Sequence, residues 1–216
     1  MAEPTSRGGM RRRQLPQGLL LALGVVATGL VLLLTVGVTK PDQAVGPTVT
    51  TTALPPPAVA PKPAVAAPVD HPDSSDVAEL DEWARRLAKP TGVPRALLAA
   101  YGRAEMWMRT ERPGCHLSWS TLAAIGQVQA VGSGPLPVPD PLWHSFAGRA
   151  SSDGKPPDPR DLDDAAFTAA RALCAGGQDL LTGQGWSTAV LGYTQSTADA
   201  HDVLAAATTY ATVAPA

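Results

Sequence analysis

The chain has 216 residues, with 17 Lys and Arg against 19 Asp and Glu, and a formal net charge of −2. Proteins that bind nucleic acids usually carry a basic patch or a high pI, so this balance argues against a nucleic-acid partner. Two cysteines are too few for a disulfide-rich scaffold or for a zinc site made of four cysteines. The first third of the chain cannot form a packed core, which leaves room for a single domain in the remainder.

The N-terminal region has the pattern of a membrane anchor. Residues 1–17 carry four arginines, and residues 18–38 follow as a run of 21 residues without a charge. About 20 apolar residues in a helix cross a hydrocarbon core of roughly 30 Å, and the positive-inside tendency keeps the arginine-rich tail in the cytoplasm. A cleaved signal peptide, the alternative, usually has an apolar region of about 7–15 residues that ends at a small-x-small site. We therefore expect a single-pass protein of the cell membrane with an extracytoplasmic C-terminal part.

Residues 39–75 are rich in Pro, Ala and Thr and include the run Pro55-Pro56-Pro57. Such a stretch favours the extended polyproline II conformation and acts as a semi-rigid spacer. It has no hydrophobic periodicity, so we assign no helix or strand to it. We expect this linker to hold the C-terminal domain away from a membrane.

Residues 76–216 have the periodicity of an all-α domain. Prolines and glycines separate apolar stripes of helical spacing, and no alternating stretch exceeds four residues. A domain of about 140 residues can bury an adequate core. The sequence predicts helices over residues 76–88, 94–112, 120–131, 141–147, 162–175, 185–195 and 197–212.

The two cysteines belong to this domain. Cys115 follows the second predicted helix and Cys174 lies in the fifth. Outside the cytoplasm a cysteine pair is more often a disulfide than a metal site. Closing a loop of about 60 residues in this way stabilises a fold by roughly 4 kcal/mol in the chain-entropy model. We predict a disulfide between Cys115 and Cys174; two buried free thiols are the alternative.

Neither a metal nor a cofactor is expected. The four histidines lack metal-ligand spacing, and no glycine-rich phosphate loop follows a strand. The acidic segment DPRDLDD (158–164) lacks the alternating pattern of a calcium loop. We interpret Asp161, Asp163 and Asp164 as groups that cap the first turn of a helix and oppose its dipole.

Four segments of the C-terminal domain resemble motifs of the lytic transglycosylases, in particular the membrane-anchored actinobacterial type with a lysozyme-like fold. The run ERPGCHLSWSTLAAIGQVQAVGSGP (111–135) is similar to the entry to their catalytic helix, ERPGC-x-L-x-W-x-x-L-A-x-I-G-x-V-E-S-x-H-G. The other three are GPLPVPDPLW (134–143), which resembles their G-P-M-Q-F-x-P-x-T-W motif, DPRDLDDAAFTAARALCAGGQDL (158–180), which resembles their D-P-x-x-I-D-D-A-A segment, and GWSTAVLGYTQS (185–196), which resembles the segment that ends in A-x-x-x-Y-N. The resemblance covers nearly all of residues 76–216 and implies a lysozyme-like domain that faces the cell wall.

The same alignment places an amide where the family has its catalytic acid. Lytic transglycosylases cleave the β-1,4 bond between N-acetylmuramic acid and N-acetylglucosamine with one glutamate, which protonates the glycosidic oxygen and later takes a proton from the 6-hydroxyl. That glutamate aligns with Gln129, whose amide can hydrogen-bond a sugar but cannot supply a proton. The Ser and His that follow in the family are Ala130 and Gly132, and the Gln of the second motif is Pro137.

The groove implied by the resemblance is altered as well. Tyr193 is retained from the family's Tyr-Asn pair, but the Asn is Thr194. Gly134 follows the first motif almost directly, whereas family members insert a loop that forms part of a groove wall. If sugar binding persists, we expect Trp143, Tyr193, Thr194 and Trp186 to contact the substrate, since flat rings can stack on sugar faces; a place in the core is the alternative for each ring.

Other carboxyl groups are weak candidates for the missing acid. Glu105 and Glu111 lie on the preceding helix, and we expect both to be solvated helix charges. Asp140 starts a short helix, and we expect it to be the N-cap.

Three hypotheses follow. The first is a membrane-anchored pseudoenzyme related to lytic transglycosylases and retained to bind peptidoglycan glycan strands or a cell-wall remodelling protein. The second is an active lytic transglycosylase with an unrecognised acid, which predicts a carboxyl group within hydrogen-bond reach of the Gln129 amide. The third is an envelope scaffold without glycan binding, which predicts an exposed apolar patch on the domain.

Overall fold

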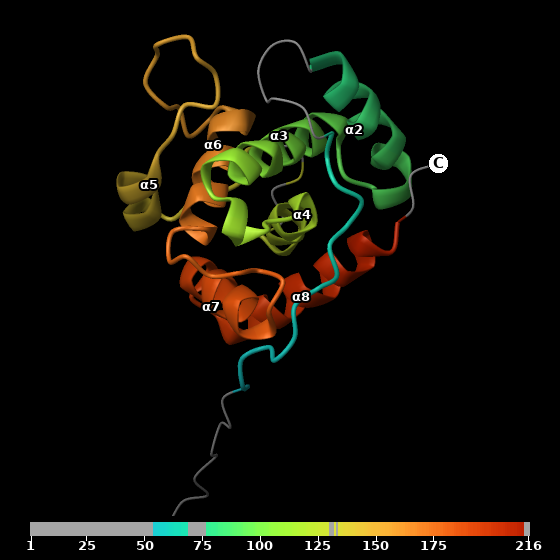
Figure 1. The fold of residues 1–216 in the computed structure, drawn as a ribbon, viewed down its shortest axis with the longest axis vertical. Helices are drawn as coiled ribbons and strands as arrows, with labels where there is room; N and C mark the ends of the chain where they lie inside the picture. The colour runs from blue at the N-terminus through green and yellow to red at the C-terminus, as the bar shows by residue number, and fades with distance from the viewer. Residues whose placement is uncertain (1–53, 69–76, 130–131, 133, 214–216) are drawn as a thin grey trace, which may run out of the picture. The chain divides into compact units, whose positions relative to one another are not determined.

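The computed structural model describes residues 54–68, 77–129, 132 and 134–213 (Figure 1). In this part of the chain every regular element is a helix, so the prediction of an all-α domain is confirmed. The membrane span expected at residues 18–38 lies outside the described residues, and no described helix is long and apolar enough to cross a membrane. The elements are α2 (Val77–Thr91), α3 (Arg95–Glu111), the 3-10 helix η2 (Pro113–Cys115), α4 (Trp119–Val128), α5 (Asp140–Phe146), α6 (Leu162–Leu173), α7 (Gly183–Thr194) and α8 (Thr197–Ala211).

Side-chain caps explain why three of these helices begin where they do. Asp161 accepts two backbone N–H bonds at the start of α6, and Thr182 and Ser196 each accept one at the starts of α7 and α8. Each such cap typically contributes about 1 kcal/mol. In the sequence, each of these starts is marked by a residue with a hydroxyl or carboxylate group just before an apolar stripe.

Most helix bounds differ from the sequence prediction by one to three residues; α4, for example, ends at Val128 and not at 131. Asp140 is the first residue of α5 and Pro139 is its N-cap, so the expected cap at Asp140 is wrong by one position. Helix α2 continues through Pro90 to Thr91, where the Thr91 hydroxyl donates to the carbonyl of Leu87 at 2.6 Å. That bond gives the Leu87 carbonyl, at the C-terminal end of α2, a side-chain donor.

The acidic segment before α6 organises a loop as well as a helix start. Of its last three aspartates, Asp161 alone caps the helix with its side chain. Asp164 is buried and accepts from the Arg149 guanidinium at 2.7 Å and from the backbone N–H of Ala150 at 2.8 Å. A buried carboxylate needs such partners, so Asp164 fixes the loop that joins α5 to α6.

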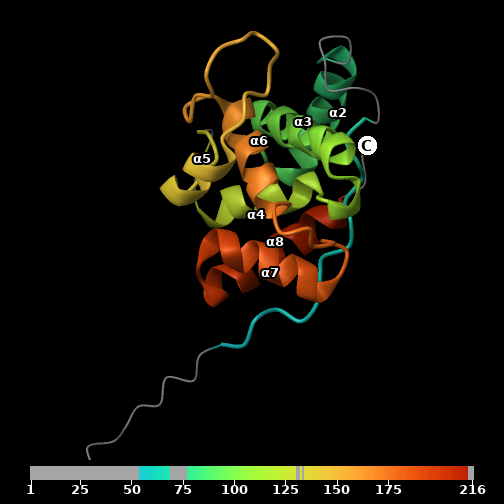
Figure 2. The same cartoon turned by 60° about the vertical axis from the view of Figure 1, so that its left-hand side comes forward.

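Helix α4 lies at the centre of the domain. Eight of its ten residues are buried, and it packs against α3, α6 and α8. Figures 1 and 2 both show it enclosed by these helices. Its first residue, Trp119, meets the ring of Trp83 edge-on at 5.5 Å between centroids and lies 6.0 Å from the ring of Tyr210. Packing against α3, α6 and α8 therefore fixes the position of the helix that leads to Gln129.

The disulfide predicted between Cys115 and Cys174 is present. It joins η2, just before α4, to the residue that ends α6, and both cysteines are buried. The bond closes a loop across 59 positions of sequence. It therefore ties the entry of the central helix to a neighbouring helix.

Residues 54–68, which we call the strap, pack on the helices. The strap belongs to one compact unit with the helical domain, from Thr52 to Ala216. Figures 1 and 2 show it in cyan, running past α4 and across α7 and α8. Pro57, Ala64 and Ala67 of the strap are buried. This part of the stretch that we expected to act as a spacer is thus attached to the domain.

Candidate functional site

Gln129, at the position of the family's acid, is the C-cap of α4. Its backbone N–H donates to the carbonyl of Ile125 at 2.9 Å, which fixes the end of the helix. The side-chain Oε1 is buried and has no hydrogen-bond partner. In the described part of the chain no carboxyl group is bonded to this amide. The described residues therefore offer no acid at the place where the second hypothesis requires one.

A pocket of about 180 Å³ lies at this end of α4. The Tyr210 hydroxyl donates to Oε1 of Gln127 at 2.5 Å, which leaves the amide N–H groups of Gln127 available to a ligand. The walls are mostly aromatic and aliphatic, with this amide at the exposed edge. The lining residues are Gly92, Val93, Pro94, Leu97, Tyr101, Ala123, Gly126, Gln127, Gly132 and Tyr210.

Two buried tyrosines near the pocket differ in how their hydroxyl groups are satisfied. The Tyr193 hydroxyl donates to the carbonyl of Pro137 at 2.8 Å. The Tyr101 hydroxyl is buried without a partner, and its side chain lines the pocket. Burial raises the pKa of both phenols well above the usual 10, so both remain neutral donors at physiological pH. A buried donor without a partner costs about 1–3 kcal/mol, so an acceptor placed beside Tyr101 would be bound favourably.

The four residues expected to contact a substrate do not form one surface. Trp186 is buried, with its indole N–H donating to the hydroxyl of Thr121 at 3.3 Å, so the expectation of a groove position is corrected to a core position. Tyr193 is buried too, and its hydroxyl holds the segment before α5. Thr194 is the last residue of α7 and Trp143 is half-buried on α5. No hydrogen bond or ring contact among the described residues links these side chains to one another.

Glu105 lies at the opposite end of α4. We expected a solvated charge, and this is wrong: the residue is 4 % exposed, because α3 is packed by other helices on several sides and by the strap. Its Oε2 accepts the backbone N–H of Trp119 at 2.9 Å, and its Oε1 pairs with Arg109. Glu105 thus caps the start of α4, a helix whose own N-cap residue, Ser118, makes no side-chain cap bond. The second expected solvated charge, Glu111, is exposed.

The position of Glu105 separates it from the site of the family's acid. Burial raises the pKa of its carboxyl group, and the charge of Arg109 opposes that rise. A raised pKa suits a general acid. However, the ten residues of α4 span about 15 Å at 1.5 Å per residue, and Glu105 and Gln129 stand at opposite ends of that helix. Glu105 therefore does not replace the missing acid at Gln129.

A second pocket, of about 290 Å³, lies between the strap and the N-terminal end of α4. Its charged groups already have partners. Arg109 pairs with Glu105, and His116 lies with its Nδ1 2.8 Å from Asp179 Oδ1. Among the described residues no group of three or more His, Cys, Asp or Glu side chains could hold a metal ion. This end of α4 is therefore built for packing of the strap.

Sequence reasoning missed the residues that form the pocket near Gln129. Tyr101 and Tyr210 occupy apolar positions of their helices, and helical spacing alone cannot distinguish a pocket wall from the core. Gln127 stands two positions before the family's acid position, and this was the one usable signal. Comparison with protein families, with curated proteins and with solved structures finds no match for this chain.

Proposed function

We propose that this protein is a membrane-anchored, lytic-transglycosylase-like protein of the cell envelope that binds peptidoglycan glycan strands without cleaving them. The proposal includes the anchor at residues 18–38 and a lysozyme-like arrangement of the C-terminal helices. The motifs at 111–135, 134–143, 158–180 and 185–196 are the reason to consider this family.

One observation carries the non-catalytic part of the proposal. The acid position is Gln129, its Oε1 is buried without a partner, and the described residues bring no carboxyl group to it. Proton transfer to a glycosidic oxygen needs a carboxyl group with a tuned pKa within hydrogen-bond reach. The one strongly buried glutamate, Glu105, is engaged at the far end of α4.

The chemistry of the pocket supports binding. Its aliphatic and tyrosine side chains form an apolar wall that suits the apolar face of a sugar, and the exposed Gln127 amide supplies donors for sugar oxygen atoms. These donors are neutral, which suits an uncharged glycan. Its volume, about 180 Å³, limits it to a single ring or a substituent of one.

The test is a co-sedimentation of the purified full-length chain, in mild detergent, with cell-wall sacculi. We expect the chain to sediment with the sacculi and to release no 1,6-anhydro-muropeptides, as measured by mass spectrometry of the supernatant. Release above a heat-killed control would show that the protein is an active enzyme. Absence of sedimentation would contradict the proposal that the protein binds glycan strands.

Two matched variants locate the binding site. Gln127→Ala removes the amide at the pocket, whereas Gln184→Ala removes an exposed glutamine on α7 that lines none of the pockets described above. Loss of one hydrogen bond worth about 1 kcal/mol weakens binding about fivefold. We expect that effect for Gln127→Ala alone. Equal affinities for the two variants would place the glycan elsewhere on the protein.

A second candidate, an envelope scaffold without glycan binding, has one observation in its favour. Leu54, Val59 and Val65 of the strap are among the large apolar side chains that remain exposed, and Leu181 beside the second pocket is exposed too. Exposed apolar patches often mark protein contacts. This candidate predicts no sedimentation with sacculi, together with photo-crosslinking of one discrete membrane protein from position 59 but not from position 184.

A further inference from the structure

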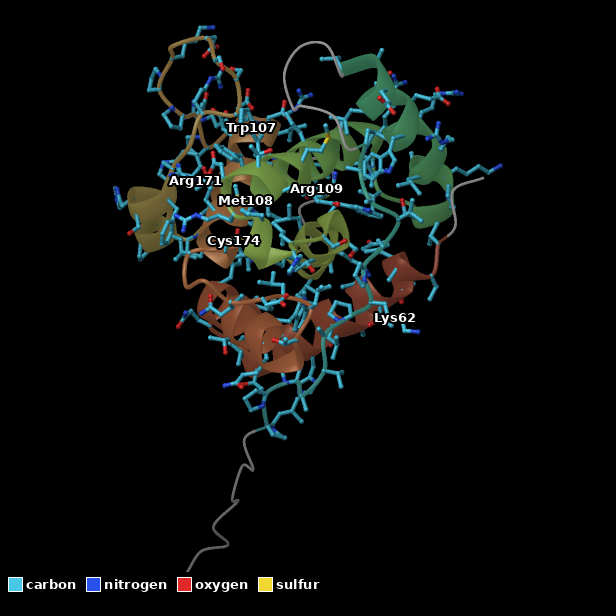
Figure 3. The ribbon with its side chains drawn as sticks, viewed as in Figure 1. Lys62, Trp107, Met108, Arg109, Arg171 and Cys174 are labelled. Carbon is cyan, nitrogen blue, oxygen red and sulfur yellow. A yellow bond between two sulfur atoms is a disulfide. The ribbon has the colours of Figure 1, made fainter. Side chains whose placement is uncertain are left out.

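Buried positions of the strap are three residues apart within each of its halves, at 57 and 60 and again at 64 and 67, with a step of four between the halves. Pro57, Ala64 and Ala67 are buried and Ala60 is half-buried, while the residues between these positions are mostly exposed. A polyproline II segment has three residues per turn, so every third side chain points to the same side. Within each half the buried positions therefore share one side of an extended segment, and that side lies on the domain. Lys62, labelled in Figure 3, is on the exposed side.

Domain side chains bind backbone carbonyls at both ends of the strap. The Trp119 indole N–H donates to the carbonyl of Val65 at 2.9 Å. The Arg109 guanidinium donates to the carbonyls of Ala67 and Pro68 at 3.0 and 3.2 Å, and in Figure 3 it lies at the end of α3 beside the strap. At the other end of the strap, the imidazole Nε2 of His201 lies 2.7 Å from the carbonyl oxygen of Pro55.

The domain admits only small side chains on the buried face. Ala67 is fully buried and Ala64 is 8 % exposed. At Gly183, the first residue of α7, an added Cβ would lie 2.2 Å from the carbonyl oxygen of Ala58, so only glycine permits the strap to pass so closely. The groove formed by Arg109, Trp119, Gly183 and His201, which we call the strap groove, therefore selects both an extended backbone and small side chains.

The strap has no backbone–backbone hydrogen bonds of its own with the described residues. Its position depends on donors and acceptors that belong to domain side chains. Domains that recognise proline-rich segments use the same combination, a preformed extended backbone placed in a groove with aromatic and polar side chains. None of these contacts requires the segment to belong to the same molecule, and exchange of identical segments between two copies preserves every contact.

We propose that the strap groove is a recognition site for an extended Pro/Ala-rich segment, filled in this structure by the chain's own residues 54–68, and that it accepts the same segment from a second copy of the chain. Specificity comes from alanine at the positions equivalent to 64 and 67, and the bonds to the carbonyls of residues 65, 67 and 68 contribute affinity. The proposal concerns a partner of this surface and does not depend on glycan binding.

The test opens the groove in the full-length chain and supplies the segment separately. Ala67→Arg places a long side chain where alanine is fully buried and so removes the chain's own strap. A fluorescent peptide of residues 52–70 is then titrated and followed by anisotropy. We expect saturable binding to the Ala67→Arg chain, and binding at least tenfold weaker to the wild-type chain, whose groove is occupied. The peptide carrying Ala66→Arg, at an exposed position, should bind like the wild-type peptide, and the peptide carrying Ala67→Arg should not bind.

Two outcomes would overturn the proposal. One is failure of the wild-type peptide to bind an Ala67→Arg chain that still melts cooperatively and keeps its disulfide. The other is equal binding of the two Arg-substituted peptides. If the Ala67→Arg chain does not fold, anisotropy with the wild-type chain at high concentration decides: the wild-type peptide should bind slowly and saturably as it displaces the strap, while the Ala67→Arg peptide should not bind. No binding of either peptide to the wild-type chain would also overturn exchange in trans.

Discussion

The two ends of helix α4 differ in how their buried polar groups are satisfied. At the N-terminal end, Glu105 and Arg109 bond to each other, to the helix and to the strap, so both charged groups have partners, whereas the Trp83 indole N–H beside Trp119 is buried without one. At the C-terminal end, Gln129 Oε1 and the Tyr101 hydroxyl are buried without partners. Buried polar groups are almost always paired, so unpaired groups need an explanation in function or in a missing ligand or water. The N-terminal end of α4, with its paired charges, is therefore built for stability, whereas the C-terminal end retains features of a binding site.

Removal of the disulfide should have the largest effect on the N-terminal end. Cys115→Ser releases the entry of α4 from the end of α6. The chain-entropy model predicts a loss of about 4 kcal/mol in the free energy of unfolding. Urea unfolding of the wild type and the variant measures the loss. Wild-type protein with added reductant serves as the control and should show the same loss; a loss below about 1 kcal/mol would mean that packing alone holds this end.

Glu105→Ala should come next. It leaves Arg109 without its carboxylate and the backbone N–H of Trp119 without an acceptor, both at the base of the strap. Breaking a buried pair in this way typically costs about 3–5 kcal/mol, and the 30 % exposure of Arg109 places the expected loss at the lower limit, about 3 kcal/mol. Chemical denaturation provides the measurement. The exposed Glu111→Ala is the matched control and should change stability by less than about 0.5 kcal/mol.

The buried tyrosines give a pair of predictions of opposite sign. Tyr101→Phe removes a hydroxyl that has no partner, so the variant should be as stable as the wild type or more stable by about 1 kcal/mol. Tyr193→Phe removes a bond to the carbonyl of Pro137 and should lose about 1 kcal/mol. Thermal melts of both variants suffice. A clear destabilisation by Tyr101→Phe would show that its hydroxyl is satisfied in solution and would end the contrast between the two ends of α4.

The smallest expected effect is on the pH dependence of stability. Burial raises the pKa of Glu105 in the folded state above its ordinary value of 4.5. Its contribution to stability is therefore complete below that value and is lost as pH rises through the folded-state pKa. Urea titrations from about pH 4 to 7 should show this loss in the wild type and not in Glu105→Gln. Parallel curves for the wild type and Glu105→Gln would contradict the prediction.

Asp179, whose pKa is lowered by the Leu181 N–H and by His116, should contribute in the opposite direction. Its contribution to stability should be lost as pH falls below 3.8, which urea titrations extended below that pH would show.

The parts of the fold that local chemistry determines were predictable. The starts of α6 and α8 lie at the predicted residues, and α7 starts two residues before its predicted start, at Gly183. The disulfide follows from a cysteine pair in a domain expected to lie outside the cytoplasm. Glu105 was misjudged because α3 is enclosed on several sides, so its helical stripe does not reveal which face is solvated. The docking of the strap was not predicted because its sequence has no apolar periodicity. Its buried side chains are small and bury little area.

The candidate site was predictable only at Gln129, where the motif aligned. Trp186 and Trp143 are both tryptophans on helices, and nothing local shows that the first is in the core while the second is half-exposed. Tyr101, Gln127 and Tyr210 come from three different helices, so their meeting at one pocket depends on tertiary packing. A sequence pattern reports neighbours along one helix and not across three.

The attachment of the strap also limits the length of chain between the proposed membrane anchor and the domain. Under the proposed anchor, residues 39–53 are all that remain between the end of residues 18–38 and the strap, and such a length of chain extends at most about 50 Å. A free linker up to residue 76 would extend more than twice as far. Under that proposal, docking of the strap shortens the length of chain that can separate the domain from the bilayer, and exchange of the strap would increase it. The groove would then control which layers of the envelope the domain can sample.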